Sequence, residues 1–306
     1  MDPTVEAALI GAAAALIGVG GTVVVAVTSA RSTRRTNQAT IDAAHADALL
    51  TLEATREAQF ADRYSRALEQ VGSDNPDVRI GGIYALEGIA LDSPRHHPTV
   101  MEVLSAFIRG HSRARTDGDS PERRPPSDVQ AALTVVGRRK TENDIRPMDL
   151  VGADLHGADL TGAHLTDAIL TSVDLTRARL TDAVLAGVNL RHANLHGAGL
   201  TRADLTRAHL QYADLNNANL YGADLTGAIL ADRVYPGYPG QGSDGDGVPV
   251  GGADFHGAVL TGAILTDVDV SDSDLTSARW PQSLPTPQGW KRRDDGGLIR
   301  EAGRQA

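Results

Sequence analysis

One residue recurs with a spacing that neither a regular helix nor a regular strand accommodates. Leucine stands at every fifth position from Leu150 to Leu230, seventeen times without a break. A small aliphatic residue, usually alanine, stands two places before it, as in MDLVGADLHGADLTGAHL at 148–165. A second run in the same phase comprises Phe255, Leu260, Leu265, Val270, Leu275 and Trp280. The structural unit of this part of the chain is therefore five residues long.

A period of five excludes both common elements as the direct explanation. In a β-strand successive side chains alternate faces, so every second leucine would point away from the core. In an α-helix a step of five residues rotates by about 140°, which would spread the leucines around the axis. The backbone must therefore bend once per repeat, so that each leucine points toward one common axis, as in a solenoid.

The individual repeats carry a family resemblance. ADLHG, ADLTG, ANLHG, ADLTR, ADLNN and ANLYG resemble the unit of the pentapeptide-repeat family, written A-(D/N)-L-x-x. The resemblance covers residues 150–280 and, in the arrangement of the whole chain, extends to a membrane-anchored bacterial type. It implies a mainly β fold, a right-handed quadrilateral β-helix with four repeats per coil and leucine and alanine inside. The implied structural core includes Leu155, Leu160, Leu190, Leu220 and Phe255.

Negative charge is concentrated in the repeats. From Asp149 to Trp280 there are 17 Asp and 7 Arg but neither Glu nor Lys, which accounts for the net charge of −10 of the whole chain. An acidic segment argues against direct nucleic-acid binding, which requires a basic surface. With four repeats per coil, residues 20 apart stack, and one outward column is acidic: Asp154, Asp174, Asn194, Asp214, Asp254 and Asp274. Such side chains either hold turns through local backbone bonds or form a surface that imitates DNA phosphates.

Residues 231–250 interrupt the repeats with a stretch rich in glycine and proline. Such a composition does not form regular coil walls. The stretch has the length of one coil, so the register of the repeats survives it, and we expect it to protrude as a loop. Long loops on rigid scaffolds often carry function, which makes this one a candidate contact site. Whether it is functional stays open.

The N-terminal stretch 7–27 contains no charged residue. As a helix it would reach about 31 Å, close to the thickness of the hydrocarbon core of a membrane. Three arginines follow it, so the positive-inside rule places its C-terminal side in the cytoplasm. We expect residues 1–35 to be a transmembrane anchor with a basic flank, and the protein to be a single-pass protein of the cell membrane with most of the chain cytoplasmic. A cleaved signal peptide and a buried soluble helix are the alternatives.

An α-helical module is expected over residues 36–110. Its first helix runs over 36–71, its second begins at Asn75-Pro76, and its third begins at Pro98. The two histidines before Pro98, His96 and His97, are expected in solvent.

The segments between the module and the repeats, and after the repeats, have their own predicted roles. Residues 111–126 are a polar, proline-rich linker. Over 127–140 we expect a short capping helix that closes the open end of the solenoid, with Ser127 as its N-cap and Gln130 in the capping-box position. The β-helix is expected over 148–280, with the loop 231–250 inside it. Residues 281–306 are expected to fold over the last coil as a cap, because an open solenoid edge invites pairing.

Nothing in the sequence indicates catalysis. The absence of cysteine excludes disulfide frameworks and cysteine-ligated metal sites, and no nucleophile, metal-ligand or phosphate-loop motif is present. We therefore expect no enzyme, no cofactor and no metal. The favoured interpretation is a membrane-anchored scaffold that mediates protein–protein interaction on the cytoplasmic side, with an unidentified partner and with a homo-oligomeric state left open. The family resemblance implies an alternative, a DNA-mimicking protein that binds DNA gyrase and confers quinolone resistance.

Overall fold

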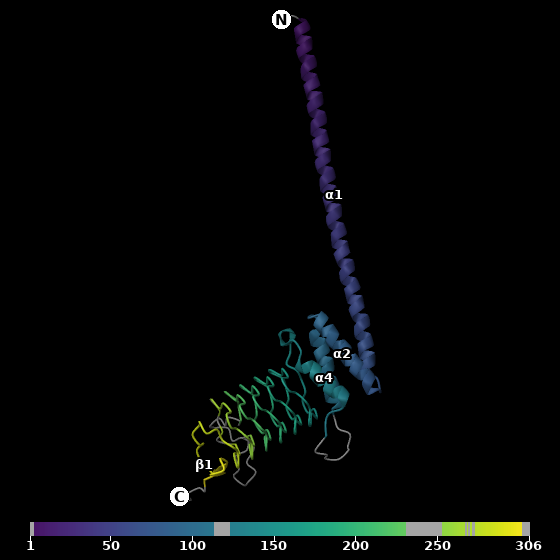
Figure 1. The fold of residues 1–306 in the computed structure, drawn as a ribbon. Coiled ribbons are helices and arrows are strands. Elements are labelled where there is room, and N and C mark those ends of the chain that lie inside the picture. Colours follow the sequence, from purple (N-terminus) through teal and green to yellow (C-terminus); the bar gives the residue numbers. More distant parts are fainter. Residues whose placement is uncertain are drawn as a thin grey trace, which may run out of the picture. The chain divides into compact units, whose positions relative to one another are not determined.

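Helices and repeats occupy separate parts of the sequence in the computed structural model (Figure 1). The structure describes residues 3–112, 123–230, 253–266, 268, 270 and 273–301, and the side chains of these residues apart from 3–33 and 36. The chain divides into two compact units, Met1–Asp62 and Arg63–Ala306, which are treated separately below.

The helix α1 (Pro3–Val71) is uninterrupted over 69 residues, so it includes the stretches 7–27 and 36–71 and joins them without the break that separate helices would have. It supplies the first unit, and its last turns belong to the second. In the part of the chain that the structure describes, no helix is both long and apolar enough to cross a membrane. The side chains of residues 7–27 lie outside that part, so the transmembrane anchor stays a prediction.

Three further helices form the helical module of the second unit. α2 (Pro76–Asp92), α3 (His97–His111) and α4 (Ser127–Gly137) pack on one another. The side chain of Asn75 accepts a hydrogen bond from the N–H of Asp77 at 2.9 Å and so caps α2, where the sequence predicts a helix start. The interior of the module consists of fully buried aliphatic side chains, among them Ile83, Leu86, Leu104, Ile108 and Leu133.

The helical module closes the backbone edge of the first coil. On two of the four walls, the N–H of Asp154 donates to Oγ of Ser112 at 3.1 Å, and the N–H of His164 donates to the carbonyl oxygen of Gly137 at 2.8 Å. The apolar stripe of α4 is completely buried: Val129, Ala132, Leu133 and Val136. Polar groups that would otherwise template the pairing of another chain are thus satisfied internally.

The predicted capping box is wrong. The N-cap position of α4 is Pro126, and no side chain caps this helix. Nε2 of Gln130 instead donates to the carbonyl oxygen of Asp159 at 2.8 Å, and its Oε1 accepts the N–H of Asp159 at 2.9 Å. The first coil has no preceding coil to bond with, so the amide of Gln130 takes the place of the missing strand.

The prediction of solvated histidines is also wrong. His97 is 2% exposed, and its Nε2 lies 3.0 Å from Oδ1 of Asp144, just after the short helix η1 (Thr141–Asn143). Arg139 bonds the other oxygen of this carboxylate at 2.8 and 2.9 Å. His96 is half-buried against Ser93. The chain after α4 folds back over the start of α3, a long-range contact that local sequence patterns do not reveal.

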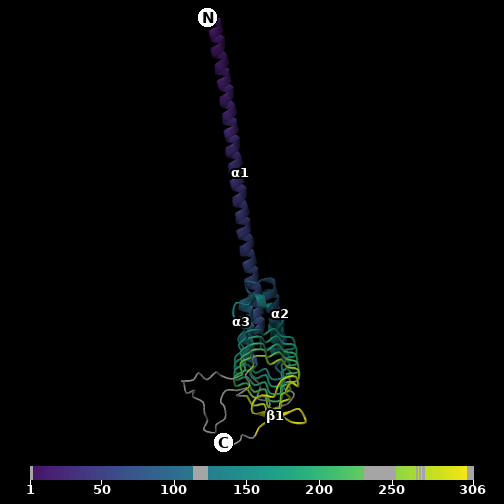
Figure 2. The same ribbon diagram turned by 90° about the vertical axis from the view of Figure 1, so that its left-hand side faces the viewer.

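The repeats form a solenoid with four repeats per coil. Parallel bridges join residues 20 apart, beginning with Asp149 to Ile169, and the coils stack as Figure 2 shows. Every leucine of the unbroken run from Leu150 to Leu230 is at most 2% exposed, and Phe255 is 1% exposed. Leu265 is only half-buried, so the interior is less complete in the last coil.

A tight turn forms each corner. The N–H of the alanine donates to the carbonyl oxygen of the leucine three residues earlier, as from Ala158 to Leu155 at 3.0 Å. The residue just before the alanine has a positive φ, for example 64° at Gly157 and 56° at Arg177. A positive φ at the third residue of such a turn, but not at the second, defines type II. Two turn residues and three extended residues account for the period of five.

The register continues across the interruption of the repeats. Asp214 pairs with Asp254, and Asn219 pairs with Val259. The coil that ends at Leu230 therefore bonds directly to the coil that follows the interruption, and no coil lies between them. Residues 231–250 themselves lie outside the described residues, so their protrusion as a loop stays a prediction.

The C-terminal tail covers the other end of the solenoid. β1 (Trp290–Arg292) and β2 (Leu298–Arg300) form an antiparallel hairpin. The N–H of Leu298 donates to the carbonyl oxygen of Ala278 at 3.0 Å, and its own carbonyl oxygen accepts the N–H of Ser277 at 2.7 Å. Leu298 is completely buried. The hairpin thus bonds part of the backbone edge of the last coil.

A glycine at a corner and a glycine inside a helix can be compared to test the corner geometry. At both positions an added Cβ would meet no atom within 4 Å, so a substitution by alanine reports on backbone conformation alone. Gly152 lies at a corner with a φ of 63°, so Gly152→Ala is expected to lower the free energy of unfolding by about 1–2 kcal/mol. Gly88 lies inside α2, so Gly88→Ala is expected to raise it by about 0.5–1 kcal/mol. Chemical denaturation measures both changes, and effects of the same sign would contradict the assigned turn.

Candidate functional site

The predicted acidic residues lie on one wall of the solenoid, here called the acidic column. Successive bridges join each member to the next, also across the interruption of the repeats. The 20-residue spacing, with one step of 40 across the interruption, thus brings all six residues into one line: Asp154, Asp174, Asn194, Asp214, Asp254 and Asp274. The role of this line as a contact surface stays a prediction.

Each member of the acidic column holds a local turn. Its Oδ1 accepts the N–H two residues later, at distances from 2.8 Å at Asp274 to 3.3 Å at Asp154. Asn194 makes the same bond with its amide oxygen, at 3.1 Å. The interpretation of these side chains as turn formers is therefore correct. The same bonds fix the direction of each carboxylate, so the column presents its charges in a defined geometry.

Part of the column is already bonded within the chain. Arg123 forms an ion pair with Asp154, and Nδ2 of Asn216 donates to Oδ2 of Asp254 at 2.8 Å. Among the described residues no cation lies within ion-pair distance of Asp174, Asp214 or Asp274. The column therefore retains negative charge along its length.

Among the described residues, the other walls have no comparable charge pattern. One carries a mixed series, Asp159, Arg179, Gly199, Asn219, Val259 and Arg279. Another carries His164, Val184, Asp204, Asp224 and Ile264. The carboxylates are therefore concentrated on the wall of the acidic column, and the surface of the solenoid is not uniformly acidic.

Arginines neutralise carboxylates elsewhere on the solenoid. Arg202 donates to both oxygens of Asp182 at 2.7 and 2.6 Å, and these hydrogen bonds hold the pKa of Asp182 below its ordinary value. Burial acts to raise the pKa of Asp159, but hydrogen bonds from Arg179 and Thr161 outweigh burial and lower it. These carboxylates stay ionised, with arginine as a local counter-ion.

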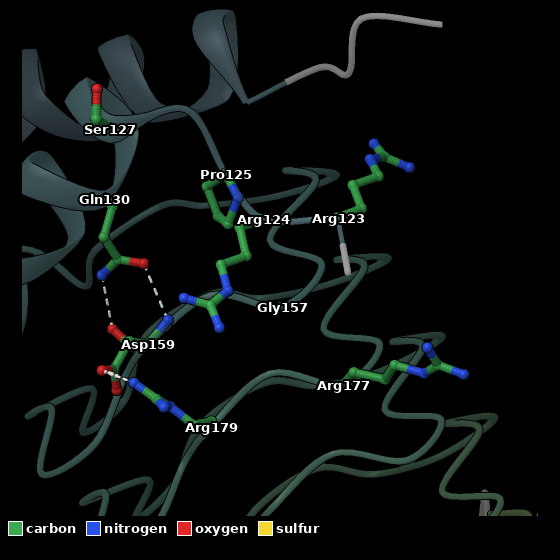
Figure 3. A pocket seen from close by; sticks show the side chains of 9 residues that line it. All are labelled: Arg123, Arg124, Pro125, Ser127, Gln130, Gly157, Asp159, Arg177 and Arg179. Atoms are coloured by element: carbon green, nitrogen blue, oxygen red, sulfur yellow. Dashed lines mark hydrogen bonds and ion pairs between the residues drawn. The ribbon is translucent and has the colours of Figure 1, made fainter. Parts of the chain in front are cut away.

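A second feature lies where the helical module meets the first coils (Figure 3). A cavity of about 740 Å³, here called the arginine cavity, is lined by nine residues: Arg123, Arg124, Pro125, Ser127, Gln130, Gly157, Asp159, Arg177 and Arg179. Sequence reasoning missed it, because its arginines come from separate stretches that only the coil geometry brings together. The pair Arg123-Arg124 inside the predicted linker was the only local signal.

The described residues contain no group of three or more His, Cys, Asp or Glu side chains arranged to hold a metal ion. The other candidate contact site of the sequence, the loop 231–250, lies outside the described residues.

Comparison with known proteins matches the repeats. The family model described as pentapeptide repeats fits the chain in eight copies, over residues 149–187, 168–207, 200–232 and 251–279. No curated protein matches the chain.

Several solved structures share the repeat. A pentapeptide repeat protein from the thylakoid lumen of Arabidopsis thaliana is 31% identical over 40% of this chain and 70% of that one, with a TM-score of 0.32. HetL, a protein involved in heterocyst differentiation regulation in a Nostoc cyanobacterium, is 30% identical over 45% and 75% of the two chains, with a TM-score of 0.17. The plasmid-mediated fluoroquinolone resistance protein QnrB1 is 17% identical over 45% and 79%, with a TM-score of 0.18. The similarity rests on the shared repeat and not on these superpositions.

Proposed function

The chain belongs to the pentapeptide-repeat family, whose members are generally non-enzymatic, and from this premise we propose that it is a scaffold that binds a protein partner through its acidic column. The observation that carries the proposal is the unbroken pairing of the six column residues, which keeps one wall acidic from the first coil to the last. The partner that fits such a wall is a protein with a basic surface.

The geometry of the column supports binding rather than chemistry. Each carboxylate is held by a backbone N–H, so little side-chain freedom is lost when a partner binds. Complementary charge steers encounter and selects against acidic partners. The column contains no nucleophile or general base in a pocket, and its shape is that of an extended surface.

Asparagine substitutions separate the charge of the column from its structural role. Asn194 already forms the turn bond of the column, so Asp174→Asn with Asp214→Asn is expected to keep the fold and remove two charges. Asp204→Asn with Asp224→Asn is the matched control, because these residues make the same turn bonds, at 3.0 and 2.9 Å, on another wall. The measurement is the amount of partner that co-purifies from membranes with each double variant of the intact chain. The Asp174→Asn, Asp214→Asn variant is expected to recover about tenfold less partner, and the control variant is expected to recover an unchanged amount.

Two outcomes would count against this proposal. Equal recovery of the partner by both double variants would remove the acidic column as the contact surface. Inhibition of DNA gyrase in a supercoiling assay, abolished by the column pair, would instead favour the alternative, a DNA mimic. The scaffold proposal predicts no inhibition at micromolar protein.

We further propose that residues 7–27 anchor the scaffold in the cell membrane, with the repeats in the cytoplasm. The uncharged stretch and the arginines that follow it, Arg31, Arg34 and Arg35, support this proposal. The intact chain is expected to stay with the membrane fraction in alkaline buffer and to be released by detergent. A variant that lacks residues 1–35 serves as the control and is expected in the supernatant. Release of the intact chain without detergent would contradict the anchor.

A further inference from the structure

The segment 144–149, here called the strap, leads from the helical module to the first coil and is fixed to α3 at two places. At one end, Nε2 of His97 lies 3.0 Å from Oδ1 of Asp144. At the other end, Nη1 of Arg109 lies 3.2 Å from Oδ2 of Asp149 and also donates to the carbonyl oxygen of Asp149. His97 is the first residue of α3, and Arg109 lies in its last turn. The strap therefore follows α3 over most of the length of the helix.

A cavity of about 330 Å³, here called the strap cavity, lies between the strap and α3. Its apolar lining comes from both segments and consists of Pro98, Met101, Ile145, Pro147 and Met148. Met101 and Met148 are buried, and the flexible side chain of methionine adapts to ligands of different shapes. The volume lies at the lower end of the range of small-molecule sites, about 300–1,000 Å³. The strap cavity therefore has the size and the lining for a small ligand with an apolar body.

One buried polar group in this lining has no partner. Ser105 lies on α3, lines the strap cavity and is only 4% exposed. Among the residues that the structure describes, none forms a hydrogen bond with its hydroxyl group. By contrast, the hydroxyl of the equally buried Ser112 accepts the N–H of Asp154. A hydroxyl that is removed from water without a partner destabilises the fold, so a ligand that bonds to Ser105 removes this cost.

The charged groups of the lining are balanced, which restricts the ligand further. Each of three arginines forms an ion pair with one of three carboxylates, at 3.2, 2.8 and 3.8 Å: Arg109 with Asp149, Arg139 with Asp144, and Arg146 with Glu102. A charged ligand would compete with these pairs and would lie near charges of its own sign as well as charges of the opposite sign. It would also lose its hydration on entering the cavity. The lining therefore favours a ligand without net charge.

These observations together define one class of ligand. The apolar lining selects an apolar body, the balanced charges select against a charged group, and the hydroxyl of Ser105 requires one group that accepts or donates a hydrogen bond. We propose that the strap cavity binds a small, uncharged, mainly aliphatic molecule whose single polar group bonds to Ser105. The strap cavity shares no residue with the acidic column, so this proposal does not depend on the partner of that column.

The methionines of the chain can report binding of a simple probe, n-hexanol. The chain has three methionines, Met1, Met101 and Met148, and the last two line the strap cavity. The measurement is an NMR titration of the intact chain in detergent, isotope-labelled at the methionine methyl groups. Binding of n-hexanol is expected to shift the signals of Met101 and Met148, with half-saturation at about 1 mM. Hexanoate and hexylammonium have the same chain with a negative or a positive group, and they are expected to bind about tenfold more weakly.

Ser105→Ala tests the polar contact. It is expected to leave the thermal unfolding midpoint unchanged, because the hydroxyl has no partner to lose, and to weaken n-hexanol binding about three- to tenfold. Ser112→Ala is the matched control. It removes the hydrogen bond to Asp154 outside the strap cavity, so it is expected to lower the midpoint and to leave n-hexanol affinity unchanged.

Three results would overturn the proposal. The first is an n-hexanol titration that shifts neither Met101 nor Met148, or that shifts the Met1 signal alone through uptake by the detergent. The second is binding of hexanoate or hexylammonium as tight as that of n-hexanol. The third is equal affinity of the Ser105→Ala and Ser112→Ala variants for n-hexanol.

Discussion

The hydrogen bond that closes each corner, from the alanine N–H to the leucine carbonyl oxygen, determines the rest of the second unit. It forces the residue before the alanine into a left-handed conformation, which ten described residues other than glycine also adopt. That conformation costs free energy at each non-glycine corner, and the burial of a leucine per repeat offsets it. Since every corner has the same geometry, outward residues 20 positions apart fall into straight columns. The acidic column and the arginine pairs are consequences of that regularity.

The first and last coils of the solenoid each have a backbone edge with no further coil to bond to. Other segments of the chain bond to these edges. The helical module bonds the first coil through Ser112, Gln130 and Gly137, and the hairpin of β1 and β2 bonds the last coil through Leu298. The arginine cavity lies at the first of these junctions, where segments with different charge patterns meet. The acidic column and the arginine cavity thus have different origins. One follows from the repeat, and the other follows from the way the repeat is terminated.

Periodic features could be predicted from the sequence, and contacts between non-periodic segments could not. The spacing of five placed Leu190 in the interior, and the spacing of 20 placed Asp154 beside Asp174. The local pattern at Gln130 suggested a capping box, but the unpaired edge of the first coil competes for the same amide. The burial of His97 depends on Asp144, which lies 47 residues away, and the arginine cavity depends on similar long-range contacts. A membrane anchor over 7–27 remains a prediction from hydropathy and charge.

The central claim is that the phase of the repeat, rather than local sequence, holds the solenoid together. Deletion of residues 231–250 joins Leu230 to Gly251-Gly252-Ala253 and restores a corner in phase, whereas deletion of 231–248 leaves two extra residues and breaks the phase. Hydrogen exchange at the amides of Phe255 and Leu260, which donate to Asp274 and Arg279 in the next coil, reports on the result. The account predicts that protection persists in the 20-residue deletion and is lost in the shorter one. Equal protection in the two deletions would contradict it.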